Sequence, residues 1–163
     1  MIPIPSPLHP AIVHFPIVLI LLGTFVAVIA AFIKRWHLPW FSAGLLMLGA
    51  LGAIGATWSG GEDEERAENL SPQADKILEE HEEWGERTRN VAIAAAVLGV
   101  AALVTASRFP KVARGLSAAT ALVAIGASYC VAETGHYGGL LVYKHGAGVD
   151  TATGVPAQRA AED

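Results

Sequence analysis

The chain has little cysteine and little charge, and each shortage excludes a class of protein. Its single cysteine, Cys130, excludes an intramolecular disulfide, and there is no Cys-x-x-Cys-His motif to attach a c-type haem covalently. Only 16% of the 163 residues are charged, below the roughly 25% of ordinary soluble domains. No basic patch is present, so we expect no nucleic-acid partner.

Apolar sequence takes the place of charge. Hydrophobic residues make up 53% of the chain, and about 20 apolar residues suffice to cross a bilayer. We therefore predict an all-α membrane four-helix bundle of up-down topology, formed by a single domain over residues 1–149. Its spans are predicted at about residues 11–33, 40–58, 91–107 and 116–132. The small and polar residues of 150–163 predict a flexible tail.

Charge is distributed unevenly between the predicted loops. Loop 59–90 carries eleven acids and four bases, whereas the turns after the first and third spans carry only bases: Lys34, Arg35, Arg108, Lys111 and Arg114. By the positive-inside rule the basic turns are cytoplasmic. We expect a bacterial inner-membrane protein with both termini extracytoplasmic. Five of the six histidines then share the outer side: His9, His14, His81, His136 and His145.

The acidic loop contains a helix signal. Ser71 is suited to the N-cap and Pro72 to the first helical position, and apolar residues follow at helical spacing. We predict a helix over about 72–89 that runs unbroken into the third span and projects beyond the bilayer. His81 lies on the one face of this helix that is suited to packing.

Glycine-rich segments flank the other spans. In the second span, Gly49, Gly52 and Gly55 share a helix face, which favours either close helix packing or room for a flat cofactor. After the fourth span, residues 137–146 are too short to cross a membrane, and we predict a strand-like or interfacial segment folded over the outer side.

A b-type haem site is the first chemical hypothesis. Such a haem needs one or two axial histidines in a mainly apolar cleft, commonly between helices. His14, His81 and His136 come from three different helices or helix ends, and Arg87 and Arg89 could neutralise the propionates. The alternative is structural, with each ring hydrogen-bonded to a neighbouring carbonyl or carboxylate.

A bare metal site is the second hypothesis. Glu133-x-x-His136 is half of the motif used in di-iron bundles, but no second copy is present, so zinc or copper is the more plausible ion. A hydrolase is not expected, because no Gly-x-Ser-x-Gly motif occurs. A transporter ranks third, because no span carries an acid or base near its middle.

Several landmarks resemble those of a widespread bacterial family. They are His9-Pro10-x-x-Val13-His14-Phe15, Ser59-Gly60-Gly61-Glu62, His81-Glu82-Glu83-Trp84-Gly85 and the segment from Gly135 to Gly146. The family comprises four-span inner-membrane proteins of unestablished function, and the last landmark resembles a branch fused to cytochrome c modules. The resemblance implies redox work. It also implies an acidic residue at the position of His136 in other members, which favours His14 with His81.

The leading prediction is therefore an electron-transfer protein or subunit of a respiratory or photosynthetic complex that binds haem b and is not a stand-alone enzyme. His14 and His81 are the preferred axial pair, and His9, His136 and His145 are held in reserve. Its expected partners are the lipid bilayer and cytochrome c or other redox subunits. The alternative is a non-redox accessory subunit whose histidines are structural or bind zinc or copper.

Overall fold

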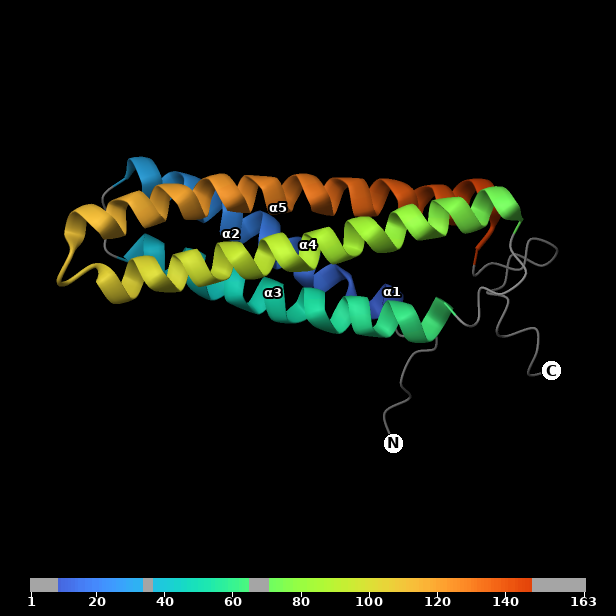
Figure 1. Cartoon of the computed structure of the whole chain (residues 1–163), viewed down its shortest axis with the longest axis horizontal. Coiled ribbons are helices and arrows are strands. Elements are labelled where there is room, and N and C mark those ends of the chain that lie inside the picture. The colour runs from blue at the N-terminus through green and yellow to red at the C-terminus, as the bar shows by residue number, and fades with distance from the viewer. Residues whose placement is uncertain (1–8, 34–36, 65–70, 148–163) are drawn as a thin grey trace, which may run out of the picture.

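The computed structural model describes residues 9–33, 37–64 and 71–147. These residues form five helices and no strand: α1 (His9–Ile12), α2 (His14–Phe32), α3 (His37–Glu64), α4 (Pro72–Thr105) and α5 (Pro110–His145). The four long helices lie side by side in an elongated bundle (Figure 1). Within the described ranges, four helical segments are long and apolar enough to cross a membrane. The all-α prediction with four candidate spans is confirmed, and the predicted tail over 150–163 lies outside the described residues.

Helix α4 begins as its sequence predicts. The Ser71 side chain accepts a hydrogen bond from the Ala74 backbone N–H at 3.3 Å, and Pro72 stands in the first turn. The helix then continues without interruption to Thr105. Its 34 residues correspond to about 51 Å, well beyond the roughly 30 Å of a hydrocarbon core. One end of α4 must therefore project out of any bilayer that its apolar half crosses.

Helix α5 corrects the prediction of a strand-like or interfacial segment over 137–146. The chain remains helical through these glycines and ends at Gly146, whose φ of 65° is left-handed. Backbone N–H groups of Gly146 and Ala147 bond the carbonyls of Val142 and Leu141, the pattern of a glycine-capped helix end. Glycine has a low helix propensity, but packing against α4 outweighs it here. Gly138 of α5 contacts the ring of His81 of α4.

A short interruption separates α1 from α2. Val13 forms a turn between the two helices. Pro16 lacks the N–H that would bond the carbonyl of Ile12, so one hydrogen bond of a continuous helix is missing at this point. Val13 keeps helical dihedral angles, with φ of −58° and ψ of −27°, and α1 contacts α3.

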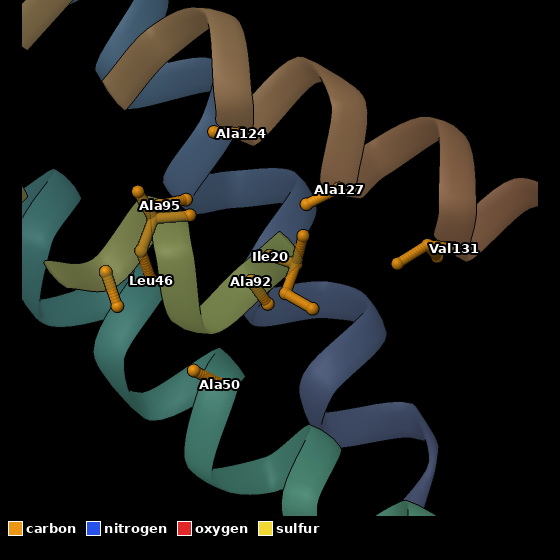
Figure 2. Packing of buried hydrophobic residues seen from close by; sticks show 9 residues of the cluster. Ile20, Leu46, Ala50, Ala92, Ala95, Ala124, Ala127 and Val131 are labelled. Atoms are coloured by element: carbon orange, nitrogen blue, oxygen red, sulfur yellow. The ribbon is translucent and has the colours of Figure 1, made fainter. Parts of the chain in front are cut away.

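The core of the bundle is made of small side chains. Ala92, Ala95, Ala124 and Ala127 are fully buried, and Ile20 and Leu46 are the largest buried apolar side chains beside them (Figure 2). Large apolar side chains lie mainly outside instead, including Phe25 and Leu122. Small residues inside and large ones outside suit helices that pack closely while facing lipid.

Helices α2 and α3 pack in antiparallel register. A Cβ added at Gly49 would lie 2.9 Å from the Ile20 side chain, and one at Gly52 would lie 3.2 Å from Pro16. Of the two roles predicted for these glycines, the structure assigns close helix packing to Gly49 and Gly52. Gly55, by contrast, has no atom within 4 Å of an added Cβ.

Candidate functional site

His9 is held at one end of the bundle by α3. Its Nδ1 lies 2.9 Å from the carbonyl oxygen of Ala56 and 3.3 Å from Oγ of Ser59. The Ser59 hydroxyl is buried and donates to the same carbonyl at 3.0 Å. The ring packs on Gly60, where an added Cβ would lie 3.3 Å from Cε1 of His9. One turn of α3 therefore supplies both a hydrogen-bond acceptor and a flat surface for this ring.

His81 is held in the same manner by α5. Its Nδ1 lies 2.9 Å from the carbonyl oxygen of Thr134. The ring packs on Gly138, where an added Cβ would lie 3.0 Å from Cε1 of His81. The Thr134 hydroxyl donates to the carbonyl of Cys130 at 2.9 Å and lies 3.1 Å from the hydroxyl of Thr88. These bonds fix the backbone that anchors His81.

The ring of His9, held by α3, lies against the ring of His81, held by α5. Their centroids are 6.1 Å apart and their planes are inclined by 88°. Carbonyl oxygens only accept hydrogen bonds, so Nδ1 is the protonated nitrogen of each neutral ring. Nε2 then carries the lone pair in both histidines, which is the tautomer that metal-binding histidines use when a carbonyl holds the other nitrogen.

Burial determines the charge of His81. Removal of the ring from water lowers the pKa of His81 below its ordinary value, and the neighbouring His9 lowers it further, against an opposing effect of the Thr134 carbonyl. His81 lies in the charged part of α4, ten residues before the apolar part begins at Val91. The ring is therefore neutral near pH 7 and its lone pair is available for coordination.

The other predicted histidines are not drawn into this pair. His14 is exposed, and its Nδ1 donates to the carbonyl of Pro10 at 2.8 Å within its own chain segment. His136 is exposed and its ring contacts the adjacent Tyr137, while His145 is half-buried in the last turn of α5. The structure thus pairs His81 with His9, a reserve ligand, and not with the preferred His14.

The two arginines predicted to face propionates have protein partners. Arg87 forms an ion pair with Glu83 and its guanidinium lies 4.6 Å from the ring centre of Trp84. Arg89 lies 3.4 Å from Glu86 and bonds the Asn90 side chain. Exposed pairs of this kind contribute little stability, so they do not prevent either arginine from binding an anion.

Sequence reasoning missed the two glycines and the two carbonyls that hold the rings. Backbone carbonyls leave no trace in a sequence, but the glycines had a signal. The doublets Gly60-Gly61 and Gly138-Gly139 both lie at the same end of the bundle as the histidine pair, in different helices. Within the described ranges no group of three or more His, Cys, Asp or Glu side chains is placed to hold a metal ion.

The fold and its lipid-facing apolar surface define an integral membrane protein. The sequence matches the family of predicted membrane proteins DUF2231 over residues 5–151, and the chain belongs to this family. No curated protein and no solved structure matches the chain.

Proposed function

We propose that His9 and His81 are the axial ligands of a b-type haem, and that the protein transfers electrons at the extracytoplasmic side of a bacterial inner membrane. One observation carries the proposal. Two imidazoles from different helices have ring centroids 6.1 Å apart. Nδ1 of His9 is anchored to a carbonyl of α3, and Nδ1 of His81 is anchored to a carbonyl of α5.

The separation of the rings is suited to a shared metal. A bond from metal to imidazole nitrogen is about 2.0–2.1 Å. With their ring centroids 6.1 Å apart, His9 and His81 are near enough that one ion held between them would take a nitrogen from each ring.

The ligand count favours haem over a bare ion. Structural zinc takes four protein ligands and catalytic zinc takes three. In the described part of the chain the ring contact joins two histidines, and no group of three or more ligand residues is placed to hold a metal ion. A porphyrin supplies four nitrogen ligands of its own, so two axial histidines complete its iron site.

Each residue of the site would have a defined task. A bound b-type haem supplies a reversible one-electron couple. His9 and His81 provide the two nitrogens, while the carbonyls of Ala56 and Thr134 fix the tautomer and raise the basicity of the ligand nitrogen. The neutral state of His81 keeps protons from competing for the same lone pair.

The charge at the two ends of the bundle supports the proposed orientation. Arg108, Lys111 and Arg114 are exposed at the turn between α4 and α5, whereas the exposed side chains near the histidine pair include Glu82 and Glu83. Basic turns stay cytoplasmic, so the site would face outward. There it would exchange electrons with a soluble redox protein, such as a cytochrome c, or with another subunit.

Absorption spectra test the proposal directly. The protein is purified in detergent, titrated with hemin, and measured oxidised and after dithionite reduction. We expect a Soret band and a sharp reduced α band in the wild type. Both bands should be lost in His9→Ala and in His81→Ala. They should persist in His37→Ala, at the far end of the bundle, and in His14→Ala.

Two results would overturn the assignment. A wild-type protein that gives no haem spectrum even with added hemin would exclude the function. Loss of the bands in His14→Ala, with the bands retained in His9→Ala, would return the axial role to His14.

A structural role is the second candidate, and His14 provides the observation that favours it. Its Nδ1 bonds a carbonyl in the same way although the ring is exposed, so this contact can serve local structure alone. The protein would then be a non-redox accessory subunit, with the histidine pair clasping helix ends or binding zinc or copper. A colourless protein that is destabilised equally by His9→Ala and His81→Ala would support this alternative.

A further inference from the structure

The histidine site consists of two half-sites of the same construction. In the first, the ring of His9 bonds the carbonyl of Ala56 and packs on Gly60. In the second, the ring of His81 bonds the carbonyl of Thr134 and packs on Gly138. The glycine follows the carbonyl residue by four positions in both cases, which places the two on one face of the helix.

We propose that Gly60 and Gly138 are positioning residues that seat the two imidazoles so that Nε2 of each is presented to a shared metal centre. This inference rests on the proposed function for its purpose. Its geometry does not depend on that function, because both seats are defined by protein atoms alone.

Backbone conformation does not explain these glycines. Both lie inside helices, and within the described ranges the positive-φ glycine is Gly146, at the end of α5. Any L-residue can adopt the backbone of Gly60 and Gly138. Glycine in a helix interior costs about 0.5–1 kcal/mol relative to alanine, so alanine would be favoured at both positions if the helix alone decided.

Space for the rings does explain them. A Cβ at Gly138 would lie 3.0 Å from Cε1 and 3.2 Å from Nδ1 of His81, and a Cβ at Gly60 would lie 3.3 Å from the same two atoms of His9. All four distances are shorter than the 3.4–4 Å of ordinary van der Waals contact. Because each ring is also tied by Nδ1 to the helix beneath it, an added methyl group must tilt the ring or stretch that bond.

The neighbouring glycines provide matched controls. A Cβ added at Gly139 or at Gly61 would meet no atom within 4 Å. Gly138→Ala and Gly139→Ala therefore make the same chemical change one residue apart, and Gly60→Ala and Gly61→Ala do so in the other half-site. All four changes raise helix propensity. The effect on helix stability is therefore shared by each pair of variants, and a difference within a pair reports the position of the ring.

The test has two readouts. In metal-free protein with ¹⁵N-labelled histidine, NMR reports the Nδ1–H tautomer of His81, with His81→Gln used for assignment. In a hemin titration, the Soret band reports affinity. We expect Gly138→Ala to disturb the His81 signal and to weaken hemin binding about 10-fold to 100-fold, and Gly60→Ala to do the same through His9. Gly139→Ala and Gly61→Ala should leave both readouts unchanged.

The outcomes separate the two proposals. Wild-type hemin affinity and unchanged ring signals in both Gly138→Ala and Gly60→Ala would overturn the positioning role of the two glycines and leave the proposed haem site intact. If the wild type binds no hemin, the proposed function fails, and the metal-free NMR signals alone decide whether the glycines position the rings. Equal effects in Gly138→Ala and Gly139→Ala would also overturn the positioning role, because only the first substitution places a methyl group against a histidine ring.

Discussion

At the scale of single residues, the state of His81 is set by its surroundings more than by its own chemistry. Its ring is largely withdrawn from water, bonds a carbonyl and faces a second imidazole. A charged imidazolium in this place would lose its hydration and would lie beside the second imidazole, His9. Desolvation outweighs the attraction of the Thr134 carbonyl, so the pKa of His81 is lowered.

This lowered pKa predicts how stability depends on pH. In the unfolded chain the imidazole takes up a proton near its ordinary pKa of about 6.5, whereas in the folded chain it does so only at lower pH. Between these two values the unfolded state binds more protons, so the free energy of unfolding must fall as the pH falls. Above about pH 6.5 His81 should make no pH-dependent contribution.

Thermal melting of the metal-free protein in detergent, from pH 8 down to pH 5, measures this effect. We expect the melting temperature to fall below about pH 6.5, and the fall to be smaller in His81→Gln. His14→Gln alters an exposed ring outside the pair and serves as the matched variant. Identical pH profiles for His81→Gln and the wild type would show that the folded protein protonates His81 as readily as the unfolded chain does, against the lowered pKa described here.

At the scale of helices, the absence of a side chain sets how closely α2 and α3 approach. An added Cβ at Gly49 would lie 2.9 Å from the Ile20 side chain and 3.2 Å from the Ile20 backbone nitrogen. A flexible side chain can move aside, but backbone in a packed helix cannot do so cheaply. Gly44, on the same helix, has open space around an added Cβ.

The pair Gly49→Ala and Gly44→Ala therefore tests helix contact against helix propensity. We expect Gly49→Ala to lower the free energy of unfolding by about 1–3 kcal/mol, the usual cost of overpacking. Gly44→Ala should be neutral or slightly stabilising, because alanine is the better helix former. Chemical denaturation in mixed micelles measures both, and equal stability of the two variants would contradict the packing described here.

At the scale of the whole molecule, the bundle has chemically different ends. Arg108, Lys111 and Arg114 are exposed at the turn between α4 and α5, and exposed acids such as Glu79 and Glu83 follow α4 toward the other end. Large apolar side chains cover the surface between them. A molecule of this kind can sit in a bilayer with the basic end retained in the cytoplasm.

Cysteine labelling in intact cells tests this orientation. In a Cys130→Ala background, a single cysteine is placed at Gln73, exposed near the start of α4, or at Arg108, exposed at the opposite end. A membrane-impermeant maleimide should label Gln73→Cys in spheroplasts and Arg108→Cys only after permeabilisation. The reverse pattern would place the histidine pair in the cytoplasm and would exclude an extracytoplasmic redox partner.

The elements were predictable where local chemistry decides them. Ser71 and Pro72 start a helix because an N-cap hydroxyl and a residue without N–H suit that end, and the helix then proceeds into the apolar segment as expected. Residues 137–146 were misjudged because glycine propensity is a local quantity, whereas the contact of Gly138 with His81 joins residues far apart in the chain.

The site was predictable only in part. The sequence indicated that histidines gather at one end, and it named His81 together with four candidates for its partner. It favoured His14, whereas the structure brings the ring of His9 against His81 and leaves His14 exposed. Which of them faces inward depends on the turn at Val13 and on the packing of α1 against α3.

The amino-acid sequence by itself determined the class of protein, the number of apolar helices, the start of α4 and the end of the bundle at which the histidines lie. These features follow from hydropathy, capping and charge, which act along the chain. Only the tertiary structure decided that His9 meets His81 and that the carbonyls of Ala56 and Thr134 and the glycines at 60 and 138 hold the two rings. Those contacts arise from helix rotation and approach, which are set by how small residues pack between helices that are distant in sequence.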